Sequence, residues 1–234
     1  MSKVYVDLDC MPWMFLNIVN IVDGQMKCSI KKQIKSNKLK DCPSKAYYTY
    51  LILDDAKFQK YRTQVDINSL IPIEPTVKDF LAFKKAIFYI GKGILNRKHQ
   101  HLTLAKKLFC GILPLNKIQL KVSKIASLWK QNKGVTLVQL DCDATSYEAL
   151  TRENCIIKSM NFNQLSNRIR GSSYGDAKKW PHIKISNYGD MLLYQLFKTY
   201  LCKTPNVIYA RDVVLKPSRT KPRYCVKCKS KMFK

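Results

Sequence analysis

Acidic residues are scarce in this chain of 234 residues. It has 16 aspartates and glutamates against 42 lysines and arginines, which gives a formal net charge of +26. Such an excess of one sign repels itself, and a polyanionic partner usually explains it. The composition therefore favours nucleic acid as the partner, ahead of an anionic membrane surface or of a basic protein with no charge-selected partner.

Long apolar runs are also missing. The longest, from Met11 to Val22, is interrupted by Asn17 and Asn20 and is well short of the ~20 residues that a helix needs to cross a bilayer. Asp7 and Asp9 stand before it, where a signal peptide carries basic residues. We therefore expect no membrane partner.

Cysteines are present, but without the spacing of a disulfide framework. Their odd number, nine, is typical of a reducing compartment, and we expect an intracellular protein of the nucleus or cytoplasm. Cys225 and Cys228 have half of the spacing of a zinc site, but no second pair follows. We expect a basic tail with two thiols there rather than bound zinc. The alternating carboxylates of Asp7 and Asp9 lack a third acid and are only a weak signal for a metal.

The apolar fraction of 46% is ordinary for a globular protein and argues against wholesale disorder. Apolar periodicity and turn residues predict strands separated by helices, without the regular βαβ alternation of a doubly wound sheet. We therefore expect a small mixed α/β sandwich of the α+β kind, with a loop between Asp55 and Thr76. Strands are predicted at about 47–54, 86–91, 135–140 and 206–215, and helices at about 77–84, 94–109, from Pro114 to Asn132, 146–160 and 189–202.

Charge and pattern divide the chain into four predicted segments. The first contains a strand-like run from Val4 to Leu8 and a lysine-rich stretch at 27–45, which is interpreted as a solvated connector or basic arm. The last holds eight lysines and arginines and no acid. The segments are an N-terminal extension at 1–45, a compact domain at 46–182, a helix and strand extension at 183–215, and a basic tail at 216–234.

The helix predicted at 146–160 carries a glutamate within its apolar stripe. At about 100° per residue, five apolar residues lie within about 60° of Glu153, whereas Glu148 and Lys158 lie on the far side. An uncompensated carboxylate on that face is costly and needs a partner. One interpretation is a salt bridge to a lysine or arginine, and the other is a ligand for Mg²⁺ or Mn²⁺. The five apolar residues are Ala149, Leu150, Ile156, Ile157 and Met160.

The helix predicted at 94–109 carries Arg97 and His101 on one face, four residues apart. They share that face with Leu104 and Leu108, so one interpretation is that their stems cover the core at the edge of the helix. The other is that Arg97 makes a charge-assisted contact to a phosphate and that His101 orients a neighbouring group.

Four segments of the chain combine residue types in a spacing that chance would not produce. Spread over roughly 47–180, they are Tyr50–Asp54, Ala86–Gly93 with Arg97 and His101-Leu102, Tyr147–Glu153, and Leu165–Asn167 with Tyr174-Gly175. Together they resemble the GIY-YIG nuclease domain, and in particular the branch found in animal LEM-domain, ankyrin-repeat proteins. The resemblance implies a sandwich with a central, mainly antiparallel three-stranded sheet flanked by helices, to which this chain adds basic extensions.

The resemblance also implies hydrolysis of DNA phosphodiesters with one divalent ion, Mg²⁺ or Mn²⁺, and selective cutting of branched or flapped DNA. By resemblance, Tyr50 and Tyr89 form a paired-tyrosine site and Glu153 holds the metal. Arg97 binds the scissile phosphate, and Asn167 supports the site. The expected catalytic residues are Tyr50, Tyr89, Arg97, His101, Glu153 and Asn167, and the residues expected to contact DNA are Lys92, Arg97, Arg168, Arg170, Lys221 and Arg223.

Alternatives stay open for one residue and for the function. The first strand has Thr49-Tyr50-Leu51 where the wider superfamily has Gly-Ile-Tyr, so Tyr47 or Tyr48 can take the role of Tyr50. The alternatives in function are a catalytically silent nucleic-acid-binding protein on a nuclease scaffold, or a nuclease of a virus or mobile element. The sequence does not specify an oligomeric state, which matters because one such site cuts one strand.

Overall fold

The computed structural model describes residues 12–40, 46–62, 76–95, 97–114, 118–202 and 206–215. Four features of the sequence lie outside these residues: the run from Val4 to Leu8, the Asp7 and Asp9 pair, the tail residues Lys221 and Arg223, and the Cys225 and Cys228 pair. In chain order the elements are α1 (Pro12–Lys35), β1 (Tyr47–Asp54), α2 (Asp55–Arg62), α3 (Val77–Ala86), β2 (Ile87–Ile94), α4 (Arg97–Phe109), α5 (Leu120–Lys130), β3 (Val135–Ala144), α6 (Ser146–Ser159), η3 (Phe162–Gln164), η4 (Gly175–Lys179), α7 (His182–Cys202), β4 (Val207–Ile208) and η5 (Ala210–Asp212).

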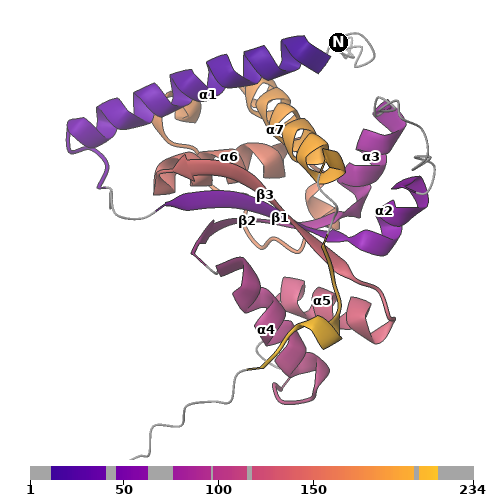
Figure 1. Cartoon of the computed structure of the whole chain (residues 1–234). Coiled ribbons are helices and arrows are strands. Elements are labelled where there is room, and N and C mark those ends of the chain that lie inside the picture. Colours follow the sequence, from indigo (N-terminus) through magenta and orange to yellow (C-terminus); the bar gives the residue numbers. More distant parts are fainter. Residues whose placement is uncertain are drawn as a thin grey trace, which may run out of the picture.

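β1 is a central strand of the sheet, which has the order β2-β1-β3-β4 and is antiparallel throughout. The predicted antiparallel sheet is thus confirmed, with the two-residue β4 as a fourth strand. Successive residues of β1 face opposite sides. Tyr50 and Ile52 join the apolar layer shared with α4 and α5, and Leu51 and Leu53 join the layer shared with α3, α6 and α7. Helices therefore cover both faces of the sheet (Figure 1).

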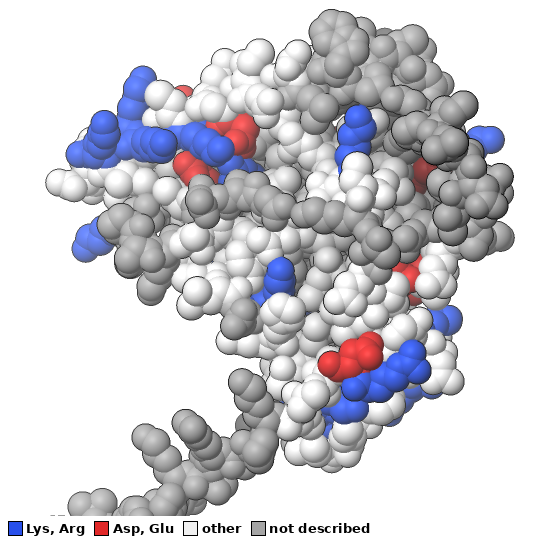
Figure 2. Space-filling view, viewed as in Figure 1, with Lys and Arg blue, Asp and Glu red and all other residues white. Residues whose placement is uncertain are grey.

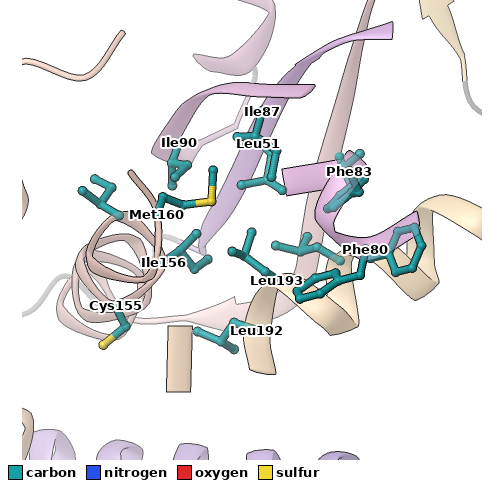
Figure 3. Packing of buried hydrophobic residues seen from close by; sticks show 14 of the residues in the cluster. Leu51, Phe80, Phe83, Ile87, Ile90, Cys155, Ile156, Met160, Leu192 and Leu193 are labelled. Carbon is teal, nitrogen blue, oxygen red and sulfur yellow. The ribbon is translucent and has the colours of Figure 1, made fainter. Parts of the chain in front are cut away.

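The larger core lies between the sheet and the helices α3, α6 and α7. Figure 3 shows Leu51 and Ile90 of the sheet together with Ile156 of α6 and Leu193 of α7, and all four side chains are fully buried. The two helices approach closely at Gly189, where an added Cβ would lie 2.1 Å from a carbonyl oxygen of α6. Burial of this apolar surface is the main force that holds α6 against the sheet.

A buried ion pair fixes α1 onto α6 and α7. Arg152 of α6 is 1% exposed, and its Nε and Nη2 donate to the Asp23 carboxylate of α1 at 2.9 and 3.0 Å. Tyr188 of α7 donates its hydroxyl to Asp23 Oδ1 at 2.5 Å, and Lys27 lies 2.8 Å from Oδ2. Two helices far apart in sequence therefore clamp the first helix through one carboxylate.

The N-terminus of α6 is fixed by a capping box. The Thr145 hydroxyl accepts the N–H of Glu148 at 3.2 Å, and the Glu148 carboxylate accepts the N–H of Thr145 at 3.0 Å. Thr145 is thus the N-cap of α6, a position at which serine and threonine are favoured. The prediction that Glu148 lies on the solvent side of the helix is wrong, because the capping box turns its side chain back over the first turn, where it is 2% exposed.

Several element boundaries differ from the predictions. The lysine-rich stretch predicted as a connector is helical as far as Lys35, and α2 occupies part of the loop predicted after β1. β2 continues to Ile94 and α4 begins only at Arg97, whereas the predicted strand at 206–215 is reduced to β4 and the single turn η5. The ends of these elements depend on contacts with distant parts of the chain, and local sequence patterns carry no information about those contacts. Every helix in the described residues is too short or too polar to cross a lipid bilayer.

Candidate active site

The candidate site begins at the outer edge of β2, which has no neighbouring strand in the described sheet. Ile90 turns its backbone groups to that edge, and the Asn167 side chain satisfies both. Its Oδ1 accepts the N–H of Ile90 at 3.1 Å, and its Nδ2 donates to the carbonyl at 2.8 Å. The N–H of Ser166 donates to the carbonyl of Phe88 at 2.6 Å. The loop after η3 is thus held along the strand by hydrogen bonds that a further strand would otherwise make.

Two tyrosines face each other across β1 and β2. The ring centres of Tyr50 and Tyr89 are 6.0 Å apart, and their hydroxyls are hydrogen-bonded to each other. Tyr50 Oη also lies 2.7 Å from His101 Nε2 of α4. Gly91 makes room for this arrangement, because a Cβ at that position would lie 2.8 Å from the Tyr89 ring. The glycine of the Tyr-Ile-Gly tract therefore has a steric reason.

The choice among the tyrosines of β1 is decided by their positions. Tyr48 donates its hydroxyl to the carbonyl of Leu95 at 2.6 Å and so fastens the turn before α4. Tyr47 lies one residue earlier, on the opposite face of the strand. Tyr50 is the tyrosine whose hydroxyl meets that of Tyr89.

Three cations lie in this site among the described residues. Lys121 Nζ of α5 donates to Tyr89 Oη at 2.7 Å and lies 4.0 Å from the ring centre. Lys92 Nζ donates to the Ser146 hydroxyl at 2.8 Å. Arg97 is exposed at the start of α4 and has no hydrogen-bond partner within the described part of the chain. Its charge influences the pKa of Tyr50, Tyr89, Lys92, His101, Lys121 and Glu153.

Glu153 is the acid of the site. Its half-buried carboxylate hydrogen-bonds the backbone N–H of Lys92, which brings α6 to the edge of β2. The ion pairs found within the described residues involve other acids. Burial raises the pKa of Glu153 to about 7, and the charges of Lys92, Lys121 and Arg97 offset that rise only in part. The carboxylate is therefore close to cations without being neutralised by any one of them.

Comparison with known proteins places this arrangement in a family. The family model of the LEM-3-like GIY-YIG domain matches residues 47–214, well over half of the chain. The chain belongs to the LEM-3-like GIY-YIG family. This is a family of endonuclease domains, so the expectation of an enzyme rather than a binding module is confirmed at that level.

Curated relatives of this GIY-YIG domain carry ankyrin repeats and a LEM domain in their names. The chain is 28% identical over 176 residues to Ankyrin repeat and LEM domain-containing protein 1 of Homo sapiens, covering 72% of this chain and 27% of that protein. The Mus musculus protein of the same name is 26% identical over 170 residues, covering 73% and 30% respectively. The Caenorhabditis elegans homolog is 32% identical over 117 residues, covering 50% and 17%. The chain thus spans less than a third of each relative, and no solved structure matches it.

The hydrogen bonds of this GIY-YIG domain run in one direction toward Tyr89. His101 Nδ1 is buried and has no hydrogen-bond partner in the described residues, so the neutral imidazole avoids an unpaired buried N–H when its proton is on Nε2. Nε2–H then donates to Tyr50 Oη, and the single hydrogen of Tyr50 is free for the Tyr89 hydroxyl. Burial and the nearby charges of Lys121 and Arg97 lower the pKa of His101 to about 4, which keeps the imidazole neutral at pH 7.

Tyr89 is the tyrosine of the pair that ionises more readily. Burial raises the pKa of both phenols, and the Glu153 carboxylate adds to the rise at Tyr89, whose pKa is about 12. Donors from Tyr50 and Lys121 both point at Tyr89 Oη. Burial lowers the pKa of Lys121 to about 8, so its ammonium form predominates at pH 7.

The structure brings together the six residues expected to act in catalysis, and Lys92 with them. Of the other residues expected to contact DNA, Arg168 is exposed and Arg170 lies over the Phe162 ring at 5.4 Å, both on the loop after Asn167. Lys221 and Arg223 lie outside the described residues.

Sequence reasoning missed Lys121. It lies in the first turn of α5, between two apolar residues, and nothing in that pattern distinguishes it from the other lysines of a strongly basic chain. Its place in the site follows from the packing of α5 against α4, which carries Arg97 and His101. Only a prediction of the tertiary arrangement would have found it.

Proposed function

We propose that this chain is a divalent-metal-dependent endonuclease that hydrolyses a phosphodiester in one strand of DNA and prefers branched or flapped DNA. One observation supports the proposal above the others. The Tyr89 hydroxyl receives hydrogen bonds from Tyr50 and Lys121 beside a carboxylate, Glu153, that has no ion-pair partner within the described residues. A site that only bound DNA would have no use for a half-buried acid among its cations.

Tyr89 is assigned the activation of the attacking water. Tyr89, whose pKa is about 12, first releases its own proton to solvent, and two hydrogen bonds donated to its oxygen stabilise the resulting anion. The phenolate then takes one proton from the water as the water attacks phosphorus, and the leaving oxygen takes a proton from solvent. Lys121 supplies the charge that holds the phenolate, and Tyr50 supplies the second donor. His101 fixes the orientation of Tyr50 by donating Nε2–H, as a neutral group that does not itself take the proton.

We assign Arg97 and Lys92 the role of binding the phosphate of the DNA. Arg97 is exposed, and its guanidinium matches a phosphate in a bidentate geometry. Lys92 is half-buried, with its ammonium 4.7 Å from the centre of the Tyr47 ring and bonded to Ser146. Burial is the main reason that the pKa of Lys92 is lowered. A phosphate between the two cations compensates charge that the folded protein leaves without a counterion.

We assign Glu153 the role of ligand for the divalent metal ion. Within the described residues no three His, Cys, Asp or Glu side chains come together, so a fully protein-made cage is not formed there. Mg²⁺ suits a site of the opposite kind, because it binds one or two carboxylates and completes its shell with waters and substrate phosphates. The single carboxylate fits Mg²⁺ or Mn²⁺ in this way. Bound beside the phosphate, such an ion stabilises charge on the phosphate oxygens.

Basic surface outside the site supports sequence-independent binding. On the face seen in Figure 2, lysine and arginine side chains gather over the C-terminal half of α1, where Lys31, Lys32 and Lys35 are exposed. We assign residues 46–182 to the catalytic domain with 183–215 as its extension, and the N-terminal extension and basic tail to salt-dependent phosphate contacts. The charge and the cysteine usage support an intracellular site of action, in the nucleus or cytoplasm.

The decisive experiment compares the full chain with Glu153→Gln on labelled duplex, flap and four-way-junction DNA, with Mg²⁺, Mn²⁺ or EDTA. We expect metal-dependent cutting that falls at least about a thousandfold in the variant, with DNA binding retained. Glu148→Gln is the matched control on the same helix, because glutamine preserves the capping box. Binding without cutting by the unchanged chain under every metal would favour the catalytically silent scaffold instead.

A further inference from the structure

The loop from 165 to 174 leaves the candidate site and is anchored by hydrogen bonds in both of its halves. Its first half is fastened to β2 by the Asn167 side chain, which bonds both backbone groups of Ile90, and by the N–H of Ser166 on the Phe88 carbonyl. Ile90 directly follows Tyr89, the residue assigned to the attacking water. These hydrogen bonds therefore fix the position of the loop relative to Tyr89.

The second half of the loop is fastened to α6. The N–H of Tyr174 donates to the Thr151 hydroxyl at 3.0 Å, and Asn154 Nδ2 donates to the Ser173 hydroxyl at 2.5 Å. Gly171 has a φ of +81° and packs so closely that an added Cβ would lie 3.1 Å from the Cβ of Asn154. With both halves anchored, residues 168–170 between them have little freedom to fold back.

Ile169 is an exposed apolar residue between the two anchored halves of this loop. Its side chain is 75% exposed, between the cations Arg168 and Arg170. Single exposed aliphatic side chains are common on proteins and need no explanation by themselves. This one differs in its surroundings, because it is flanked by two arginines, held by a doubly anchored loop, and two residues from Asn167, hence within about 7 Å of it along the chain.

We propose that Ile169 is a wedge that enters the base stack of DNA at a branch or strand end, while Arg168 and Arg170 contact the flanking phosphates. The proposal rests on the proposed function and gives it a source of substrate selectivity. Aliphatic side chains that enter a base step partly unstack it, and the energy required is smallest where pairing is already interrupted. A rigid wedge beside the cutting centre therefore favours flaps and junctions over intact duplex.

The position of the wedge relative to the reacting end of the site makes a spatial prediction. Successive bases are about 3.4 Å apart along a strand, so a wedge on the loop that borders the site should disturb a base step within a few nucleotides of the cut. 2-Aminopurine, a fluorescent base that brightens when unstacked, reports this disturbance when placed at each of those positions in turn.

The test uses the full chain and one DNA sequence in three forms: intact duplex, flap, and a flap whose step is already opened by an abasic site opposite the 2-aminopurine. In EDTA, binding of the flap should raise 2-aminopurine fluorescence several-fold, and Ile169→Ser should remove most of that rise while Ile169→Leu keeps it. Ile183→Ser, on α7, is the matched control because Ile183 is similarly exposed at 67%.

Cleavage with Mg²⁺ completes the test. Ile169→Ser should cut the flap about tenfold more slowly than the unchanged chain but cut the pre-opened flap within about twofold of it. An unchanged fluorescence rise in Ile169→Ser, or equal loss of cutting on all three DNAs, would overturn the wedge. If the unchanged chain cuts none of the DNAs but its fluorescence rise depends on Ile169, the proposed function fails and the wedge stands.

Discussion

Two consecutive residues of α6, Arg152 and Glu153, carry opposite charges into opposite environments. Arg152 is fully buried and meets the Asp23 carboxylate through two hydrogen bonds. Glu153 is half-buried, and three cations stand near it without forming an ion pair. One helix thus has a face where charge is compensated within the fold and a face where it is not.

The difference shows in the direction of the two pKa shifts. Burial alone would raise the pKa of Asp23, but Arg152, Lys27 and the Tyr188 hydroxyl outweigh burial and lower it. At Glu153 burial prevails over Lys92, Lys121 and Arg97, and the pKa is raised. Paired charge stabilises the docking of α1, whereas unpaired charge lowers stability and is retained where a substrate or metal completes it.

The largest effect is expected when the ion pair between Asp23 and Arg152 is broken. Asp23→Ala removes the carboxylate that Arg152 binds and should lower the free energy of unfolding by about 3–5 kcal/mol. Urea denaturation followed by circular dichroism measures it. DNA cleavage by the fraction that stays folded should be nearly unchanged, because Arg152 and Glu153 face different neighbours.

The control for that change replaces both charges together. Asp23→Leu with Arg152→Leu leaves no buried charge and should recover much of the lost stability. If the double variant is as unstable as Asp23→Ala, the pair does not act as a unit, and α1 is docked by its apolar residues alone.

The next largest effect is expected near the unpaired Glu153, at Lys121, which is assigned a hydrogen bond to Tyr89 and not a contact with DNA. Lys121→Met removes a donor from Tyr89 Oη and should lower kcat about a hundredfold with KM for DNA nearly unchanged. Lys124→Met makes the same substitution at an exposed position of the same helix and should be nearly silent. A rise in KM with kcat preserved would make Lys121 a phosphate contact instead, and partial rescue by Lys121→Arg would support the hydrogen-bond role.

Part of this comparison was accessible from the sequence. The Thr145 cap, the strands of Tyr50 and Tyr89, and the place of Glu153 on α6 follow from local patterns: a polar cap, aromatic strands and a 100° periodicity. The family follows from the resemblance that those same segments carry, and the antiparallel sheet was expected because that resemblance implies it.

The rest depends on contacts between distant parts of the chain. Helical periodicity placed Glu148 toward solvent, but the capping box buries it. The Asp23 and Arg152 pair joins residues 129 positions apart, and Lys121 meets Tyr89 across 32. Neither pair can be predicted from the local sequence, because both depend on how the helices pack on the sheet.

The smallest expected effect links both faces of α6 through pH. Folding raises the pKa of the Glu153 carboxyl from its ordinary value of 4.5 to about 7, so the folded state holds this proton more tightly than the unfolded state. The group is then neutral in both states below about pH 4.5, and stability is lost as the pH rises through about 7. Glu153→Gln cannot ionise, so above pH 7 it should be more stable than the unchanged chain by about 1–2 kcal/mol, a value reduced for partial solvent screening. Urea unfolding of both proteins from pH 4.5 to pH 8 measures the difference, in which shared titrations cancel. If the difference in unfolding free energy grows with rising pH, the ionised Glu153 carboxylate lowers the stability of the fold and is retained for the site. If the Gln variant is less stable at every pH, Glu153 belongs with the paired, structural charges.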